Sequence, residues 1–164
     1  MIIKGKAIKY GDDVNTDVII PGRYLHLIKP AELASHAMED LDPDFFKKFN
    51  RGDIIVAGKN FGCGSSREQA AMCLKYAGAS AIIAKSFARI FYRNAINQGL
   101  PIIESLEAAD FIKDMDNLEI DLYAITIKDK TKSLQFEIQP LPIFMQEILD
   151  DGGLVYNLKK KLRR

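Results

Sequence analysis

The feature that most constrains the fold is a strand, a glycine-rich loop and a helix that follow one another between residues 53 and 77. Asp53–Ala57 is a short apolar run, which is typical of a buried strand. The loop starts at Gly58, and a helical pattern runs from about Ser66 to Ala77. Gly78 follows it, and glycine is common just past the end of a helix. This order predicts a buried strand that is connected to a surface helix.

The same alternation continues along the next stretch of chain. Ala81–Ala84 predicts a second apolar strand, Ile90–Gln98 predicts a helix that ends at Gly99, and Pro101–Ile103 starts a third strand. Strands that alternate with helices favour a parallel sheet. We therefore expect a largely parallel α/β arrangement over residues 53–103.

The flanking segments predict further strands and helices. Alternating polar and apolar residues predict strands at 2–10, 118–122, 124–127 and 134–138, the last three being antiparallel and joined by turns such as 128–132. Helical patterns cover 31–39, 43–49 and 143–150, the last of which ends at Gly152 and Gly153. Residues 11–17 are interpreted as a polar loop. Without repeats or a linker, we expect one domain over residues 1–164.

Composition excludes several classes of function. The net charge of +1 offers no general attraction for nucleic acid or membrane, and the basic residues 159–164 are interpreted as a solvated helix end or tail. We see no signal peptide and no apolar run near the roughly 18 residues that cross a membrane. Cys63 and Cys73 have neither a disulfide framework nor metal-ligand spacing. We expect a reduced, cytoplasmic protein.

The glycine-rich loop has the residue types of an anion site. Ser65 stands three residues before Glu68, the capping-box spacing, so we expect Ser65 or Ser66 at the helix N-cap. The free backbone amides and the positive end of the helix dipole would then face the loop. Arg67 is unfavourable in a first helical turn unless an anion completes the site. Arginine binds a carboxylate through two parallel hydrogen bonds.

The residues alone leave alternatives open. The loop could be an ordinary capped helix start with Arg67 turned to solvent. A nucleotide site is less well supported, because the loop lacks the Lys-Ser/Thr ending of a phosphate-binding loop. A thiol nucleophile at Cys63 is another reading, since a helix N-terminus lowers thiol pKa values. No histidine lies nearby in the sequence, so a cysteine that lines the loop is favoured.

The run Gly58–Glu68 resembles the signature of the aconitase swivel domain, which also exists separately as the small subunit of 3-isopropylmalate dehydratase and of homoaconitase. Three more segments resemble the family in the same order: 11–19, 85–101 and 140–154. The resemblance covers nearly the whole chain. It implies an α/β fold, the swivelling β/β/α domain of the aconitase C-terminal type, with a mixed sheet and flanking helices.

The resemblance also implies a reaction and a set of site residues. Family members are hydro-lyases, which move a hydroxyl between adjacent carbons of a malate-type di- or tricarboxylic acid by dehydration and rehydration. On the matching positions, Ser65 is the base that removes a proton from carbon, Ser66 supports the substrate and Arg67 holds a carboxylate. Thr16 and Asp17 match active-site residues of the N-terminal motif. The helix N-terminus, the loop amides and Arg67 would stabilise the serine alkoxide.

The family cofactor is an iron–sulfur cluster that acts as a Lewis acid. In this family the cluster is usually bound by three cysteine thiolates. This chain has only two cysteines, Cys63 and Cys73, and their spacing does not suit such a cluster. The resemblance therefore implies a 4Fe-4S cluster in a separate large subunit, in a heterodimer or heterotetramer, and no metal in this chain. We expect the chain alone to be inactive. A free-standing anion-binding module and a purely structural subunit remain as alternatives.

In this family a loop just after the first motif tunes the substrate. Here it is Pro21–Ile28, with Leu25, His26 and Leu27 as the candidate specificity residues. Tyr-Leu followed by apolar residues resembles isopropylmalate enzymes of leucine biosynthesis, whereas Tyr-Leu-Arg resembles homoaconitases. His26 matches neither. We expect an isopropylmalate-type alkyl-malate substrate, with homoaconitate, or another alkyl-malate or related hydroxyacid, as the alternatives. We expect no substrate contact from Arg23 or from His36.

Overall fold

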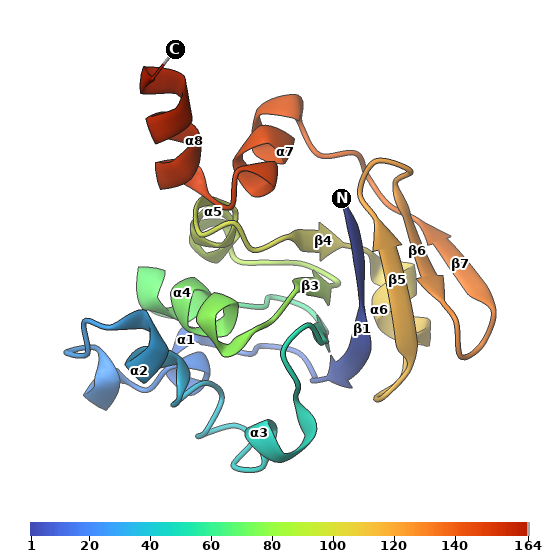
Figure 1. The fold of residues 1–164 in the computed structure, drawn as a ribbon. Helices are drawn as coiled ribbons and strands as arrows, with labels where there is room; N and C mark the ends of the chain where they lie inside the picture. Colours follow the sequence, from blue (N-terminus) through green and yellow to red (C-terminus); the bar gives the residue numbers. More distant parts are fainter. Residues whose placement is uncertain (164) are drawn as a thin grey trace.

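A seven-stranded sheet with the order β4-β3-β2-β1-β5-β6-β7 organises the molecule (Figure 1). The computed structural model describes residues 1–163. The strands are β1 (Ile2–Lys9), β2 (Ile54–Ala57), β3 (Ala81–Ala84), β4 (Ile102–Glu104), β5 (Asn117–Asp121), β6 (Thr126–Asp129) and β7 (Leu134–Glu137). The helices are α1 (Thr16–Ile19), α2 (Pro30–Ala34), α3 (Phe45–Lys48), α4 (Glu68–Ala77), α5 (Arg89–Asn97), α6 (Leu106–Phe111), α7 (Ile143–Asp150) and α8 (Leu154–Leu162), with a short 3₁₀ helix η1 (Gly22–Tyr24).

The sheet has a parallel half and an antiparallel half that share β1. Strands β1 to β4 pair in parallel, with Ala7 opposite Ile54 in the β1–β2 register. Strands β5, β6 and β7 are antiparallel, and β5 pairs with the other edge of β1. Every residue of β2 and β3 is buried, whereas burial alternates along β6. This is the pattern expected of covered parallel strands and half-covered antiparallel ones, and it confirms the predicted mixed sheet.

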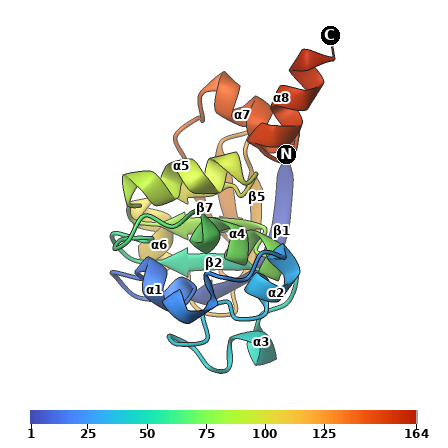
Figure 2. The ribbon, with the colours of Figure 1, turned by 90° about the vertical axis from the view of Figure 1, so that its left-hand side faces the viewer.

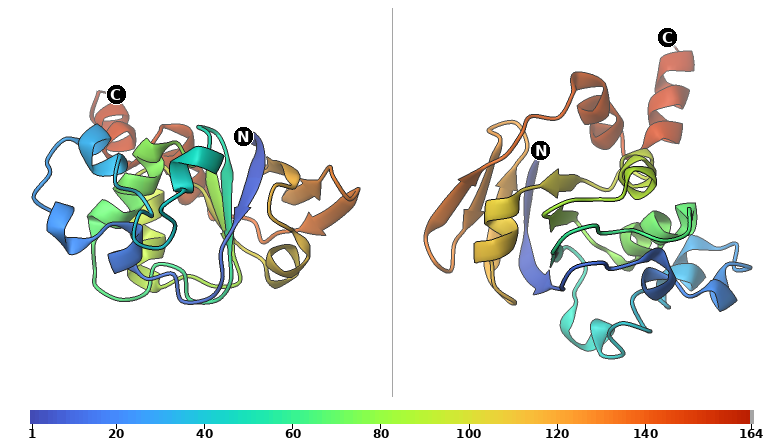
Figure 3. Two further views of the ribbon diagram at one scale, coloured as in Figure 1. Left: turned by 90° about the horizontal axis from the view of Figure 1, so that it is seen from below. Right: turned by 180° about the vertical axis from the view of Figure 1, so that it is seen from behind.

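Helices cover both faces of the sheet. α1, α2, α4 and α5 lie on one side of the parallel strands, in front of them in Figure 2, and α6 lies on the opposite side. Figure 3 shows that β6 and β7 stand away from the parallel strands and that α8 projects beyond the body of the molecule. None of the helices within residues 1–163 is both long and apolar enough to cross a membrane.

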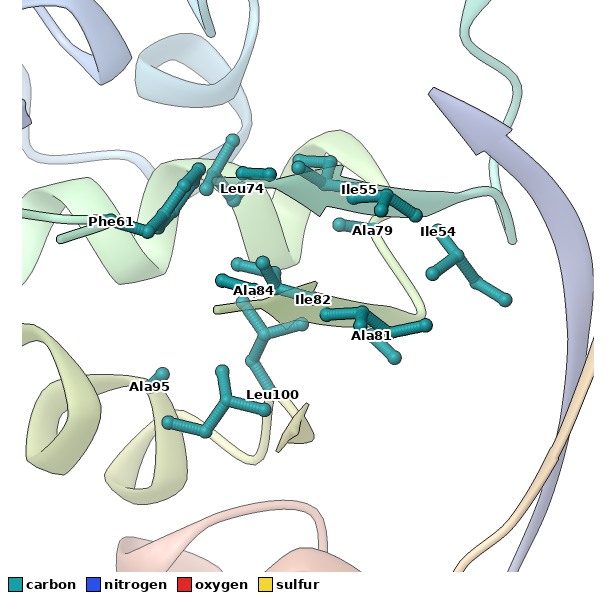
Figure 4. Packing of buried hydrophobic residues seen from close by; sticks show 14 of the residues in the cluster. Ile54, Ile55, Phe61, Leu74, Ala79, Ala81, Ile82, Ala84, Ala95 and Leu100 are labelled. Carbon is teal, nitrogen blue, oxygen red and sulfur yellow. The ribbon is translucent and has the colours of Figure 1, made fainter. Parts of the chain in front are cut away.

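The hydrophobic core lies between β2, β3 and the helices α4 and α5 (Figure 4). Ile82 on β3 is completely buried, as are Leu74 on α4 and Leu100 after α5. Phe61 of the glycine-rich loop is also fully buried, and its ring meets the Phe91 ring edge-on at 5.2 Å between centroids. The loop is therefore anchored by its own aromatic side chain.

Several short helices were not predicted. α1 occupies part of the expected polar loop, because the Asn15 side chain accepts hydrogen bonds from Asp17 N and Val18 N and so caps a single turn. α6 is capped in the same way by Ser105. The segments expected to be helical at 31–39 and 43–49 contain only the short helices α2 and α3.

Helical structure continues beyond Gly152 and Gly153, where the last helix was predicted to end. Their φ angles of +84° and +133° end α7 and redirect the chain into a further helix, α8. The basic residues Lys159, Lys160 and Lys161 fall in the last turn of α8, where cations are favourable. Arg164, the last residue of the predicted basic tail, lies outside the described residues.

Replacing Ile82 with alanine tests the position of the core. Ile82 is fully buried on a central strand, so we expect Ile82→Ala to lower the free energy of unfolding by about 2–5 kcal/mol. Ile28 is 91% exposed, so we expect Ile28→Ala to change it by less than about 0.5 kcal/mol. Urea denaturation of both variants measures the difference. Equal losses would show that the core is not built around β3.

Candidate active site at the carboxyl edge of the parallel strands

Two loops run side by side at one edge of the sheet. β1 and β2 are parallel, so the loops that follow them leave the same edge. Asp13 N donates to Lys59 O at 2.8 Å, and Gly62 N donates to Val14 O at 2.7 Å. The N-terminal motif and the glycine-rich loop, about 50 residues apart in sequence, therefore form one structural unit.

A third loop, which follows β3, supports the glycine-rich loop from its other side. Phe61 N donates to Ser86 O at 3.0 Å, and Ala88 N donates to Phe61 O at 2.9 Å. Asn60 N also donates to the Ser86 side-chain oxygen at 2.8 Å. The sequence did not mark Asn60 or Ser86 as part of the site. They hold the loop in place rather than face its open side.

Two glycines of the loop are required by space and backbone geometry. Gly62 has a φ of +78°, and a Cβ there would lie 2.2 Å from Phe91 Cγ. A Cβ at Gly58 would lie 1.8 Å from Asp12 Oδ1. That carboxylate accepts a hydrogen bond from Lys59 N at 2.7 Å. Only glycine permits this close approach between the loops.

The predicted N-cap at Ser65 or Ser66 is wrong. α4 begins at Glu68, its N-cap residue is Arg67, and no side chain caps it. The Ser65 carbonyl, which an N-cap residue would offer to its own helix, instead accepts a hydrogen bond from Thr16 Oγ1 at 2.8 Å. Glu68 does not complete a capping box either, because its carboxylate accepts from Gln98 Nε2. Within the described part of the chain, the first amides of α4 are left without a side-chain partner.

Ser65 and Ser66 precede α4 and are both exposed. Among residues 1–163, neither the Ser65 nor the Ser66 hydroxyl forms a hydrogen bond to another residue. Thr16 is 2% exposed, and it fixes the Ser65 backbone through its side chain and the Cys63 carbonyl through its amide. The serine hydroxyls are thus held on a rigid backbone with their own hydrogen-bonding capacity unused.

Arg67 turns inward rather than to solvent. Its side chain is 17% exposed, and Nη2 lies 2.5 Å from Asp17 Oδ1. Nη1 donates to Ile20 O at 3.2 Å. The guanidinium therefore ties the start of α4 to α1 and to the chain that follows α1. Of the predicted residues, the structure brings Thr16, Asp17, Ser65 and Arg67 into direct contact.

The predicted specificity loop starts beside this guanidinium. A Cβ at Gly22 would lie 3.7 Å from Arg67 Nη2, which places the first residue of η1 next to the site. Leu25 and Leu27 are half-buried and pack against the hydrophobic core. His26 is exposed. Its side chain has no hydrogen bond or ion pair to any residue that the structure describes.

The site is an open rim of the molecule. A groove of about 550 Å³ lies elsewhere, between α4, α5 and the start of α8, and neither Ser65 nor Arg67 lines it. The candidate site is therefore an exposed rim, distinct from this groove. Within residues 1–163, no group of three or more His, Cys, Asp or Glu side chains is arranged to hold a metal ion.

The Asn15 cap is the site element that the sequence could have predicted. Asparagine is a preferred N-cap residue, and it stands directly before Thr16 and Asp17. The single turn that it starts sets the orientation of both residues. No sequence signal marked the Ile20 carbonyl, because any residue would supply one.

Cys63 is not an activated thiol. Burial and the negative charge of Asp13 raise the pKa of Cys63 above its ordinary range. Burial also raises the pKa of Cys73 to about 12. A raised pKa leaves less of the nucleophilic thiolate at neutral pH. The cysteine that lines the loop is therefore favoured over the nucleophile.

Alkylation by iodoacetamide tests this assignment. We expect Cys63 in the folded chain to react more slowly at pH 7 than the thiol of an unfolded peptide, and to speed up as the pH rises. Asp13→Asn should speed the reaction at neutral pH, because it removes a charge that raises the pKa. Cys63→Ser should abolish labelling of the folded chain, since Cys73 is fully buried. Faster reaction than the peptide at pH 7 would contradict the assignment.

Comparison with known proteins places this site in a family. A model of the family described as "Aconitase C-terminal domain" matches residues 30–107, which include the glycine-rich loop. The 3-isopropylmalate dehydratase small subunit of Caldicellulosiruptor saccharolyticus is 57% identical over 164 residues, which cover all of this chain and 95% of that protein. The small subunit of Wolinella succinogenes is 53% identical and covers 98% of this chain and 96% of its own length.

A solved structure agrees with these relatives. The crystal structure of 3-isopropylmalate dehydratase from Methanocaldococcus jannaschii has a TM-score of 0.93 and 56% identity, and the match covers 98% of this chain and 95% of that one. The predicted swivel-domain fold is thereby confirmed. The fold, the signature loop and full-length identity above 50% agree, and this chain belongs to the family of 3-isopropylmalate dehydratase small subunits.

Proposed function

We propose that this chain is the small subunit of a hydro-lyase that interconverts 2-isopropylmalate and 3-isopropylmalate by dehydration and rehydration, a step of leucine biosynthesis. The observation that carries the proposal is the exposed Ser65, whose hydroxyl has no hydrogen-bond partner among the described residues, beside an inward-turned Arg67. The chain is also 57% identical to such small subunits over its full length.

Ser65 is the residue that removes the proton from the carbon next to the departing hydroxyl. An ordinary serine is far too weak an acid to supply an alkoxide at neutral pH. The uncapped start of α4 supplies free amides and the positive end of a ten-residue helix. The positive charge of Arg67 adds to this stabilisation. Ser66, equally exposed, supports the bound substrate with its hydroxyl.

Arg67 binds a substrate carboxylate. Asp17 positions Arg67, and Thr16 positions Ser65. Arg67 Nη2 already forms an ion pair with Asp17 Oδ1, so the guanidinium is aligned before substrate binds. Asp17 therefore belongs to the active site, and its contact with Arg67 supports an orienting role. Thr16 does the same for Ser65 through the Ser65 carbonyl. A pre-aligned guanidinium loses less entropy when it grips a carboxylate in two places.

The described residues do not fit an iron–sulfur cluster. Such a cluster needs several thiolates, and Cys73 is fully buried on α4 while Cys63 is half-buried in the loop. A 4Fe-4S cluster would be held by a large subunit, where it acts as a Lewis acid on the substrate. The open rim around Ser65 supports a partner that completes the site. We propose a cytoplasmic heterodimer or heterotetramer in which this chain is one domain.

The loop after α1 favours a branched alkyl group. Leu25 and Leu27 are partly buried apolar residues that pack against the core, and the same loop starts at Gly22 beside Arg67. A homoaconitate substrate would need a cation for its distal carboxylate, and exposed His26 is the residue at the matching position. The 57% identity to 3-isopropylmalate dehydratase small subunits supports the alkyl-malate over this alternative. A non-catalytic anion-binding module or a purely structural cover would leave Ser65 without a role.

Ser65→Ala tests the chemical assignment. In a complex reconstituted with its large subunit, we expect this variant to lower kcat for 3-isopropylmalate by about 10²–10⁴-fold, because the proton transfer loses its base. KM should change much less. Ser35→Ala, an exposed serine outside the site, should keep full activity. A loss of only a few fold in Ser65→Ala would favour the structural cover, and turnover by the isolated chain would refute the need for a partner.

His26→Arg tests the substrate assignment. An arginine at this position offers a cation to a distal carboxylate. We expect the ratio of kcat/KM for homoaconitate over 3-isopropylmalate to rise by roughly tenfold or more. His26→Val should leave 3-isopropylmalate the preferred substrate, because it keeps the loop apolar. An unchanged ratio in His26→Arg would show that this loop does not contact the variable part of the substrate.

A further inference from the structure

A cluster of five polar and aromatic side chains sits at the base of the specificity loop. Arg23 and Tyr24 belong to η1, and His36, Glu39 and Asp40 follow α2. In Figure 1 this blue segment lies at the outer edge of the molecule next to α4. Among the described residues, none of these five side chains forms a hydrogen bond or ion pair with the proposed catalytic and carboxylate-binding residues. Their contacts nevertheless join the two ends of the loop that carries Leu25, His26 and Leu27.

Arg23 donates hydrogen bonds through both of its terminal nitrogens. Nη1 and Nη2 donate to the two Asp40 oxygens at 2.9 Å and 2.7 Å, a bidentate pair, and Nη2 also donates to Glu39 Oε1 at 2.7 Å. Its guanidinium carbon lies 4.7 Å from the centre of the Tyr24 ring. Isolated surface ion pairs contribute little, but bidentate arginine pairs and networks are the exception.

The second half of the cluster is a stacked pair of rings. The Tyr24 and His36 rings lie 3.6 Å apart between centroids and are nearly parallel, at 11°. His36 Nδ1 lies 2.9 Å from Glu39 Oε2, so one carboxylate contacts both the histidine and Arg23. The stack is partly buried, since Tyr24 packs against the core.

A backbone contact closes the loop further down. Met38 N donates to Ile19 O at 2.9 Å, and Met38 is fully buried with a φ of +62°. The chain between residues 20 and 37 is therefore a loop with a pinned base. Its tip has fewer anchors, because Ile28 is 91% exposed and His26 has no polar partner among the described residues.

We infer that Arg23, Tyr24, His36, Glu39 and Asp40 form a clasp that positions Leu25 and Leu27 and so sets the preference for a branched alkyl group. The inference rests on the proposed function and deepens it. The backbone of Tyr24 accepts from Leu27 N at 3.0 Å, so a shift of Tyr24 is passed directly to Leu27. Residues of the clasp are positioning residues, since they act through the loop and do not touch substrate.

The test compares 3-isopropylmalate with 3-methylmalate, which keeps both carboxylates and shortens the alkyl group. In the reconstituted complex, we expect Arg23→Gln to lower the kcat/KM ratio of the longer over the shorter substrate by roughly tenfold, through a higher KM for 3-isopropylmalate. Asp40→Asn should do the same, and the double variant should be no worse than either single one, because both remove one interaction. Arg51→Gln, an exposed arginine away from this loop, is the matched control.

Each outcome separates this inference from the proposed function. A ratio within twofold of the parent in both Arg23→Gln and Asp40→Asn, or additive losses in the double variant, would overturn the clasp. A parent complex that does not turn over 3-isopropylmalate would overturn the proposed function instead. Equal losses on both substrates, with a lowered melting temperature, would show that the cluster only stabilises the fold and would also overturn the inference. Lysine restores the charge but not the two-nitrogen fork, so incomplete recovery in Arg23→Lys would support a role for bidentate geometry.

Discussion

The parallel pairing of β1 with β2 is the constraint on which the rest of the site depends. The loops that follow two neighbouring parallel strands start at the same edge of the sheet. This holds for β1 and β2, although 44 residues separate the end of β1 from the start of β2. The contacts between those loops, from Asp13 to Lys59 and from Thr16 to Ser65, exist only because of this register. The Asp17–Arg67 ion pair is the last member of the same series. A sheet in which β1 paired antiparallel to β2 would place the two motifs at opposite ends of the molecule.

Hydrogen bonds that run between the loops also explain why the serines are free. The Thr16 hydroxyl donates to the Ser65 carbonyl, which would otherwise accept the first hydrogen bond of a helix that starts after Ser65. The helix α4 therefore starts at Glu68, and no side chain among the described residues caps its first amides. Local helix stability is thereby given up at a point where an anionic ligand or an alkoxide could restore it. The open rim fits the proposed arrangement, in which a partner subunit would exclude water and supply the Lewis acid. Three observations support the proposal that this chain supplies the base and a large subunit supplies the cluster: the hydrogen bonds between the loops, the exposure of Ser65 and the family membership.

Local sequence patterns predicted the regular elements best where one interaction dominates. β3 at Ala81–Ala84 and α7 at Ile143–Asp150 have the predicted bounds, since a buried apolar run and a periodic amphipathic segment are strong signals. The single-turn α1 gives no periodic signal, and only its Asn15 cap marks it. α8 was missed because a pair of glycines indicated an end, whereas Gly152 and Gly153 redirect the chain between two helices. The capping-box prediction failed because a residue from another loop competes for the Ser65 carbonyl.

The sequence by itself determined the residue types of the site: the glycines, the two serines, the arginine and the Thr-Asp pair, together with the alternating strands and helices that deliver them. These follow from local rules of backbone freedom, charge and periodicity. Tertiary structure alone decided that Arg67 faces Asp17 rather than solvent, that α4 starts after the serines, and that the proposed specificity loop is pinned through Arg23 and Asp40. Each of these depends on contacts between segments that are distant in sequence. Their geometry is set by strand register and packing, which no local pattern encodes.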